Sequence, residues 1–347
     1  MELLKRGDQF PGISGYEGRV GEKLIEWIEP FANYKVDGIG NLIVELGEGE
    51  EKAIFMAHMD EIGLLITGIT EDGKLKFKKI GGIDDRLLIG RHVDVITEDG
   101  KLDGVIGVTP VHLNLERKFD TIPWYAMEID IGAESREEAL ELVKPLDYAV
   151  FKKHFAVLNR RYVSTRSLDD RFGVVALFEA IKDFVDHDLN GRFIFAFTVQ
   201  EEIGLKGAKF LAERYNPEFA FAIDSFACCS SLTGDVRLGK GAVIRAVDNS
   251  AIYTRRLARK ILEIAKKNKI PIQIGVTGGG TDASVFQHKS EVLALSVPIK
   301  YLHSEVEMLH LDDLNALIKL IQATVFEPQP EVINCSNISA ISRLVFS

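Results

Sequence analysis

The sequence is poor in cysteine and in long apolar runs, and each shortage excludes a class of protein. Its 347 residues include 3 cysteines (Cys228, Cys229 and Cys335), whose spacing forms neither a disulfide framework nor a zinc ribbon. No stretch approaches the ~20 consecutive apolar residues of a membrane span. The opening segment MELLKRGDQF lacks the apolar centre of a signal peptide. We therefore expect a cytoplasmic protein that does not bind membranes.

Basic residues are the minority charge. The chain has 42 Lys and Arg against 52 Asp and Glu, which gives a formal net charge of -10. Binding to nucleic acid depends on clustered Lys and Arg, so we expect no nucleic-acid partner. With 46% hydrophobic and 27% charged residues, the composition is that of an ordinary globular protein. The length allows two domains, or one large domain with an insertion.

The sequence pattern changes character twice along the chain. Residues 63–158 are dominated by expected strands and turns, and the heptapeptide ITEDGKL occurs there twice, at Ile69–Leu75 and Ile96–Leu102. Each copy has an Asp-Gly turn between β-type runs, so each is predicted to form the tip of a hairpin. Before and after this region, helical patterns alternate with short apolar strands, which is typical of a sheet covered by helices.

These patterns predict an α/β protein with an α/β/α arrangement around a mixed sheet. Residues 1–62 and 159–327 are expected to form this discontinuous domain. Residues 63–158 are expected to form an inserted β-rich, β-barrel-like domain, and residues 328–347 a C-terminal tail. Because ligands of open α/β sheets bind beyond the carboxyl ends of the strands, the residues at those ends are the candidates for function.

Histidine and acidic residues gather at the expected strand ends. Four strand ends and one helix start carry them: His58, Asp60 and Glu61; Glu201 and Glu202; Asp224; His303; and, at the helix start, Asp169 and Asp170. Chance could place one or two such segments at one edge of a sheet. Five independent segments indicate a site.

The residue types at these ends indicate a metal centre. Imidazoles and carboxylates without a nearby cysteine suit a divalent ion such as Zn²⁺, Co²⁺ or Mn²⁺. Two ions ~3.5–4 Å apart need a carboxylate that bridges them and at least one further ligand each. Glu201 and Glu202 follow a strand in near-extended backbone, so their side chains point to opposite sides. We therefore predict that Glu202 binds metal and that Glu201 stays free to accept a proton from a water.

At this point the sequence resembles the tetrahedral aminopeptidases, a family of dinuclear metallopeptidases also called cellulase M or endoglucanase M. The resemblance rests on six motifs in the family's order: AHMDEIG, SLDDRFG, QEEIGLKGA, AID, GGGTDAS and YLHSEVEM. It covers about residues 1 to 327. It implies a phosphorylase/hydrolase-like metallopeptidase fold and an inserted domain that mediates dimerisation and further assembly into a hollow tetrahedral dodecamer.

The resemblance also implies a role for each matched residue. Two divalent ions, most simply Zn or Co, would be held by five ligands: His58 and Asp224 on one ion, Glu202 and His303 on the other, and Asp169 on both. Glu201 matches the general base, and Asp60 the acid that orients His58. A cis peptide bond is expected between Asp169 and Asp170. Thr281 and Asp282 fall in a motif near the substrate pocket.

The predicted function is that of an aminopeptidase, which removes N-terminal residues from peptides by a dinuclear-metal-activated hydroxide. A glycoside hydrolase is the alternative, but it needs only two carboxylates facing across a sugar bond and leaves His58 and His303 without a role. A non-catalytic metal-binding scaffold is a second alternative, and it leaves Glu201 without a role. The segment after Asp224 and the pair Lys289-Ser290 depart from the family pattern, so no preferred N-terminal residue is predicted.

Several neighbouring residues are given simpler interpretations. Glu61 is expected to be a loop acid or an acid at the rim of the site, and Cys228 and Cys229 small buried hydrophobic residues. Asp170 either shapes its loop or supports the ligands, and the sequence does not separate these two. The remaining histidines are expected to be structural or exposed, with His310 a helix cap or surface residue: His92, His112, His154, His187, His288 and His310.

Overall fold

The computed structural model describes residues 1–7, 10–110, 112–113 and 122–326. The predicted C-terminal tail and Cys335 lie outside the described residues. Within this part of the chain, none of the helices is both long enough and apolar enough to cross a membrane.

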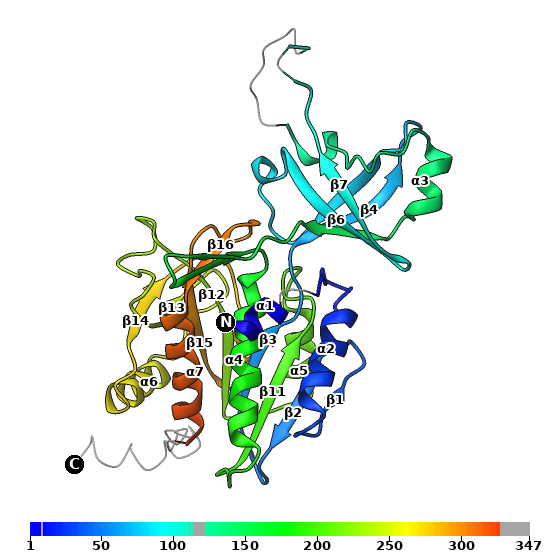
Figure 1. Cartoon of the computed structure of the whole chain (residues 1–347). Coiled ribbons are helices and arrows are strands. Elements are labelled where there is room, and N and C mark those ends of the chain that lie inside the picture. Colours follow the sequence, from blue (N-terminus) through cyan, green and yellow to red (C-terminus); the bar gives the residue numbers. More distant parts are fainter. Residues whose placement is uncertain (8–9, 111, 114–121, 327–347) are drawn as a thin grey trace, which may run out of the picture.

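An eight-stranded mixed sheet forms the centre of the larger unit (Figure 1). Its spatial order is β1-β2-β11-β3-β12-β15-β13-β14. The strands are β1 (Lys35–Val36), β2 (Leu42–Leu46), β3 (Glu51–His58), β11 (Arg192–Thr198), β12 (Phe219–Ala227), β13 (Ala242–Val247), β14 (Ile272–Val276) and β15 (Glu291–Ile299). Strands β11, β3, β12 and β15 run parallel to one another, whereas β2 and β13 pair antiparallel with their neighbours β11 and β15. The predicted mixed α/β sheet is confirmed.

Apolar side chains on both faces explain why the central strands are buried. In β11 every residue after Arg192 is buried, as expected for a strand covered by helices on both sides. The ring of Phe55 stacks between those of Phe221 and Phe195, with centroid distances of 4.6 and 5.6 Å. These aromatic contacts join three neighbouring strands and fix their relative positions below the sheet edge that carries the acids.

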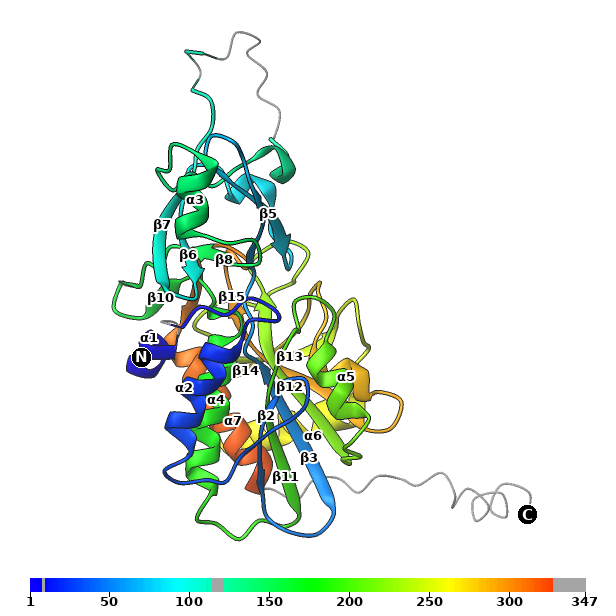
Figure 2. The ribbon, with the colours of Figure 1, turned by 90° about the vertical axis from the view of Figure 1, so that its right-hand side faces the viewer.

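Helices cover both faces of this sheet. Helices α2 (Gly18–Ile28), α4 (Leu168–Phe184) and α7 (Leu311–Phe326) lie on one face, and α5 (Lys206–Ala212) lies on the other (Figure 2). The remaining helices of this unit are α1 (Glu2–Gly7) and α6 (Arg255–Lys267). Helix α4 is buried on nearly all sides, and its first turn brings Asp169 and Asp170 to the carboxyl ends of the parallel strands.

A second, five-stranded antiparallel sheet has its own apolar core (Figure 1). Its order is β5-β4-β8-β6-β7, built from β4 (Gly63–Ile69), β5 (Leu75–Ile80), β6 (Arg91–Thr97), β7 (Gly100–Ile106) and β8 (Tyr148–Phe151). Both ITEDGKL segments form hairpin tips as predicted, because Ile69 pairs with Leu75 and Thr97 with Gly100. Helix α3 (Arg136–Leu142) follows Ser135, whose Oγ accepts a hydrogen bond of 3.2 Å from the Glu138 amide.

A third sheet of three short strands was not predicted from the sequence. It consists of β9 (Ala156–Leu158), β10 (Tyr162–Thr165) and β16 (Glu307–His310), in the order β16-β10-β9. Strand β16 has only four residues, and its partner β10 lies about 145 residues away in sequence, so no local pattern announces it. This strand places Glu307 directly behind the candidate site.

Candidate metal centre

The parallel strands bring the candidate residues to one edge of the large sheet. His58 is the last residue of β3, Glu201 and Glu202 follow the end of β11, and Asp224 lies in β12. His303 follows β15. Since β11, β3, β12 and β15 all run in the same direction, their carboxyl ends share one edge, where α4 adds its first turn.

Two groups of possible metal ligands meet at a single aspartate. The first group is His58, Asp169 and Asp224, and the second is Asp169, Glu202 and His303. Within each group, one ligand atom of every residue lies within 4.8 Å of the others. The Nε2 atom of His58 is 3.2 Å from Oδ1 of Asp169, whereas Nε2 of His303 is 3.4 Å from Oδ2. The two oxygens of Asp169 therefore face different histidines, which is the arrangement that a bridging carboxylate requires.

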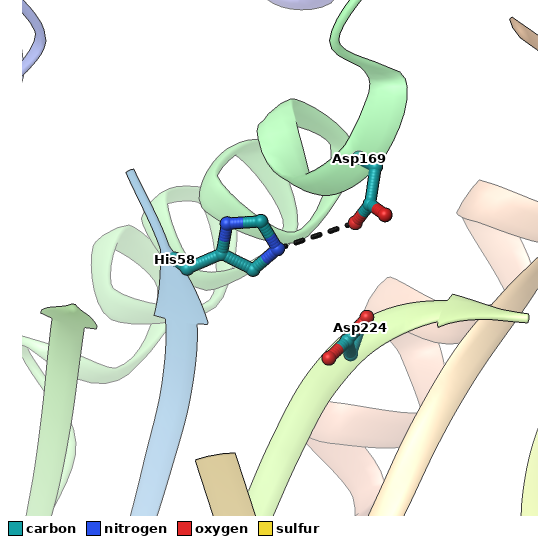
Figure 3. A group of neighbouring side chains, drawn as sticks. All are labelled: His58, Asp169 and Asp224. Carbon is teal, nitrogen blue, oxygen red and sulfur yellow. Dashed lines mark hydrogen bonds and ion pairs between the residues drawn. The ribbon is translucent and has the colours of Figure 1, made fainter. Parts of the chain in front are cut away.

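Figure 3 shows how three elements converge on the first group. His58 points from β3 toward Asp169 at the start of α4, and Asp224 rises from β12 below them. In the second group, Nε2 of His303 is 3.2 Å from Oε1 of Glu202. The fold thus brings together all five residues that were expected to be metal ligands.

The carboxylates in the two groups of possible ligands stabilise positive charge on the histidines beside them. Burial alone would lower the pKa of His303, but hydrogen bonds with Asp169 and Glu202 raise it to about 12. Burial likewise opposes the charged form of His58, yet Asp169 and Asp60 raise its pKa well above the usual value. Burial would raise the pKa of Asp169, but both histidines lower it strongly. Imidazole and carboxylate donors grouped in this way fit divalent ions, which take the place of the protons on the histidines.

Glu201 lies beside both groups without belonging to either. Its pKa is raised well above the usual value, first by burial and then by the neighbouring carboxylates of Asp224, Glu202 and Asp282, although His58 lowers it. A carboxylate with a raised pKa next to a metal centre is a suitable proton acceptor. Burial also raises the pKa of Asp224, to about 7, against the lowering effect of Arg245.

Asp60 contacts both the histidine and the loop that carries the two glutamates. Its Oδ1 atom is 3.5 Å from Nδ1 of His58, and its backbone oxygen is 3.1 Å from the same nitrogen. The carboxylate also accepts hydrogen bonds from the backbone amides of Glu201 and Glu202, at 3.0 and 3.1 Å, and from Oγ of Ser14 at 2.6 Å. Nδ1 of His58 is thereby occupied, and Nε2 is left to face Asp169.

Asp170 both shapes its loop and supports a ligand residue. The side chain is fully buried, and its oxygens accept hydrogen bonds from the backbone amides of His58 and Gly173, at 3.2 and 3.1 Å. The peptide bond between Asp169 and Asp170 is cis, as expected. The two interpretations left open by the sequence therefore both apply.

Glu307 is a supporting residue that the sequence reasoning missed. Its buried carboxylate accepts hydrogen bonds from the backbone amides of Asp169 at 3.0 Å and of His303 at 2.8 Å. It thus holds two ligand residues from behind. The only signal in the sequence was its place in the motif YLHSEVEM, four residues after His303.

Glu61 lies in the connection between β3 and β4, as one of its two interpretations has it, but the interpretation as a rim acid is wrong. Only 2% of this residue is exposed, and its carboxylate contacts the guanidinium groups of Arg166 and Arg171 and the hydroxyl of Ser167. It also accepts a hydrogen bond of 3.1 Å from the amide of Gly12. The guanidinium groups of Arg166 and Arg171 compensate the charge of this buried carboxylate. Both arginines lie more than 100 residues from Glu61 in sequence, so the residues around Glu61 do not indicate them.

The structure also tests two of the simpler interpretations, those of the neighbouring cysteines and of His310. Cys228 and Cys229 are half-buried, so the expectation that they are buried is wrong. His310 accepts a hydrogen bond of 3.1 Å from the amide of Asp312 through Nδ1 and caps α7, one of its two predicted roles. Among the described residues, no other histidine belongs to a group of possible metal ligands.

A cavity of about 580 Å³ opens above the two groups. Its walls include Asp169, Glu201, Glu202, Asp224, Arg245 and His303, with Gly278, Gly279 and Gly280 on one side. Thr281 and Asp282 directly follow this glycine segment, are buried and do not line the cavity. Thr281 hydrogen-bonds to the hydroxyl of Tyr253 at 2.7 Å, and Asp282 accepts a hydrogen bond of 2.5 Å from Thr198.

An α/β sheet with two histidine–carboxylate groups that share one aspartate, next to a glutamate that belongs to neither group, defines the dinuclear metallohydrolase class. Residues 40–320 match the M42 glutamyl aminopeptidase family, and the chain belongs to this family. It is therefore a metal-dependent aminopeptidase, a peptide hydrolase.

Individual relatives cover nearly the whole chain. A lysyl aminopeptidase of Pyrococcus furiosus is 36% identical over 342 residues, which are 95% of this chain and 97% of the relative. The TET1 peptidase of Pyrococcus horikoshii, a protein that can assemble into a tetrahedron or a large octahedral shell, is 75% identical with a TM-score of 0.92. The match covers 94% of this chain and 99% of that one. An aminopeptidase of Desulfurococcus kamchatkensis is 33% identical with a TM-score of 0.88, over 96% and 98% of the two chains.

Proposed function

We propose that this aminopeptidase holds two divalent ions, one in each ligand group, and that Glu201 is its general base. The observation that carries the proposal is the sharing of Asp169: its two oxygens face His58 and His303, while Glu201 stays outside both groups. His58 and Asp224 complete one ion's ligands, and Glu202 and His303 complete the other's. The mixture of imidazole and carboxylate without cysteine favours Zn²⁺ or Co²⁺.

The chain's own residues account for the movement of the proton. Divalent ions in the two groups would polarise the peptide carbonyl and lower the pKa of a water between them. Glu201 borders the cavity, and its raised pKa suits a group that accepts a proton from water and returns it to the leaving amine. Asp60 keeps His58 oriented, and Asp170 and Glu307 fix the backbone of the ligand residues.

The substrates are proposed to be peptides with a free amino end. With Glu202 and Asp224 used as metal ligands, the carboxylate of Glu201 is the acid of the cavity wall that would face the amino end of a substrate, which favours cleavage of the first peptide bond. Thr281 and Asp282 are proposed to support the substrate pocket, because both are buried and directly follow the glycine residues that line it. Glycoside hydrolysis would leave the two histidines and the shared aspartate without a role. Activity on aminoacyl-p-nitroanilides rather than on carboxymethylcellulose distinguishes the two reactions.

Removal of metal is expected to abolish activity. A chelator at equilibrium withdraws both ions, because each group offers only three ligand residues from the chain and opens onto the cavity. Hydrolysis of an aminoacyl-p-nitroanilide should fall to background after dialysis against a chelator and return when Zn²⁺ or Co²⁺ is added. Full activity in metal-free protein, with the metal content checked by elemental analysis, would contradict a metal-dependent site.

We also propose that the chain forms homo-oligomers through residues 63–158. This segment contains the five-stranded sheet and exposes large apolar side chains, with Tyr125 at 75%, Leu113 at 71% and Leu146 at 64% exposure. Apolar side chains gathered on one unit are typical of a surface that another subunit covers. A dimer is the basic expectation, and a dodecamer built from dimers follows from the similarity to PhTET1-12s, a 74% identical protein with a TM-score of 0.92 that has a dodecamer in the asymmetric unit of its crystal.

If the chain forms homo-oligomers, its molecular mass in solution should be larger than that of one chain. Light scattering at micromolar concentration should give a multiple of the chain mass of 38.6 kDa, with a dodecamer as the full assembly. A variant without residues 63–158, closed by a short linker, should be smaller. A monomer mass for the intact chain would contradict the proposal, and full assembly of the shortened variant would place the interface on the larger unit instead.

A further inference from the structure

Four consecutive backbone amides in the loop of Glu201 and Glu202 are each bonded to a side chain from elsewhere in the chain. Oδ1 of Asn41 accepts from the amide of Val199 at 3.1 Å, and Oε1 of Glu17 accepts from the amide of Gln200 at 2.9 Å. Asp60 accepts from the next two amides, those of Glu201 and Glu202. A loop just outside a strand has no partner strand for its amides, and here three side chains replace it.

Each of these three side chains is itself fixed. Glu17 is 6% exposed, and the same Oε1 atom accepts a second hydrogen bond of 2.9 Å from the amide of Gly15. Ser14, one residue before that glycine, donates to Asp60 at 2.6 Å. The segment is attached to the end of β3 by a hydrogen bond of 2.9 Å from the Glu61 amide to the Gly12 carbonyl. Residues 12–17 are therefore tied to the sheet on one side and to the loop of the glutamates on the other.

Asn41 holds the loop at its other end. Its side-chain amide donates to the carbonyl of Gly207 at 3.1 Å and to Asp37 at 2.8 Å, and the residue has no exposed surface. A β-carbon at position 207 would lie 2.3 Å from Oδ1 of Asn41 and 2.6 Å from the carbonyl oxygen of Val199. Only glycine therefore allows the loop to close around this asparagine.

We propose that Glu17 and Asn41 are positioning residues that set the placement of Glu201 and Glu202. Neither side chain lines the cavity or belongs to a ligand group, so each acts through the loop backbone. Gln200 adopts a left-handed conformation with φ of 56°, and the amide bonded to Glu17 belongs to this residue. The hydrogen bond thus fixes the loop at the turn that directs Glu201 and Glu202 to their separate tasks. This inference rests on the role proposed above for Glu201.

Three substitutions of Glu17 separate geometry from charge. Glu17→Gln keeps the length of the side chain and an oxygen that accepts both hydrogen bonds, but removes the charge. Glu17→Asp keeps the charge and is one methylene shorter, so its oxygens no longer reach both amides. Glu17→Ala removes the acceptor. If placement is what matters, Gln retains function and both Asp and Ala lose it.

The expected result is a loss of kcat with little change in KM. A displacement of a catalytic group by about 1 Å can cost about 100-fold, so kcat of Glu17→Ala should fall by about 10- to 100-fold. Glu17→Asp should fall in the same direction, and Glu17→Gln should stay close to the wild type. In amide hydrogen exchange, the peptide covering residues 199–207 should exchange faster in the Ala and Asp variants than in the wild type and the Gln variant. This second readout does not depend on activity.

Two parallel variants keep the result interpretable. Asp313 also uses a buried carboxylate to hold two loop amides, those of Gly239 and Gly241 at 2.7 and 2.6 Å, but away from the cavity. Asp313→Ala should therefore leave kcat unchanged below its unfolding temperature. Glu201→Gln, measured alongside, tests the proposed base itself. If Glu201→Gln loses turnover while Glu17→Ala and Glu17→Asp keep it, the positioning inference fails alone.

Other outcomes also decide the matter. A Glu17→Gln variant as slow as Glu17→Ala would mean that charge, not the placement of the loop, is what Glu17 supplies, and would overturn the inference. Unchanged exchange of the 199–207 peptide in Glu17→Asp would overturn it as well. If Glu17→Ala does not fold, Glu17→Asp carries the test, because it retains a carboxylate in the buried position.

Discussion

Replacement of Glu201 by glutamine is expected to lower kcat by about 10²- to 10⁴-fold, the usual contribution of a general base. Glutamine preserves the size of the side chain but cannot accept the proton. The loop should keep its shape, because the backbone amide of residue 201 still donates to Asp60. Steady-state hydrolysis of an aminoacyl-p-nitroanilide measures the effect, with KM expected to change little.

The neighbouring glutamate supplies the matched control for this prediction. Glu202→Gln changes the same kind of side chain in the same loop, but Glu202 belongs to a ligand group with Asp169 and His303. This variant should lose part of its metal, whereas Glu201→Gln should retain the full amount in elemental analysis. Near wild-type turnover in Glu201→Gln, or loss of metal from it, would show that Glu201 is not the base.

The part of the site that could be predicted from the sequence is the part set by strand ends. Runs such as RFIFAFT are apolar throughout and predict buried strands, and the polar residue that follows each run marks its carboxyl end. Because parallel strands share one edge, His58, Glu202 and Asp224 could be assigned to one site before their contacts were known. The different roles of Glu201 and Glu202 followed from the alternation of side chains, whereas the roles of the other residues came from the resemblance to a family.

The residues that support the site could not be predicted in this way. Glu17, Glu61 and Glu307 are buried acids whose partners lie 183, 105 and 138 residues away in sequence. A local pattern indicates which side of an element faces the core. It does not indicate which distant amide will donate a hydrogen bond to a buried carboxylate, or which distant guanidinium will compensate its charge. Glu61 illustrates the error: an acid in a loop reads as exposed until Arg166 and Arg171 are placed beside it.

The β-hairpins and the small third sheet show the same division. Both ITEDGKL hairpins were predictable, because the Asp-Gly turn and the flanking strands are neighbours in sequence. Strand β16 was not, because its pairing of Tyr162 with His310 joins residues that lie 310 − 162 = 148 positions apart in sequence. Elements held by local contacts are visible in the sequence, and elements held by distant ones need the fold.

Replacement of Asp169 by alanine is expected to have the largest effect of any single ligand change, with loss of both metal ions and of measurable peptidase activity. Asp169 is the one residue common to both ligand groups, and its two oxygens lie 3.2 and 3.4 Å from the Nε2 atoms of His58 and His303. Without it each group keeps only two of its three residues. The two ions would also lose the negative charge between them that offsets their mutual repulsion.

His303→Ala is the comparison that separates a shared ligand from a private one. His303 belongs to one group only, so its removal should weaken mainly one ion and leave the group of His58, Asp169 and Asp224 complete. Elemental analysis of both purified variants should give close to none of the metal for Asp169→Ala and about half of the wild-type amount for His303→Ala, as expected for two sites of which one is lost. Asp169→Ala also removes a hydrogen bond of 2.9 Å from Oγ of Ser225, which could affect folding. Circular dichroism of both variants therefore serves as the check that they are folded. Full occupancy of both ions in folded Asp169→Ala would show that the two groups do not depend on a common carboxylate.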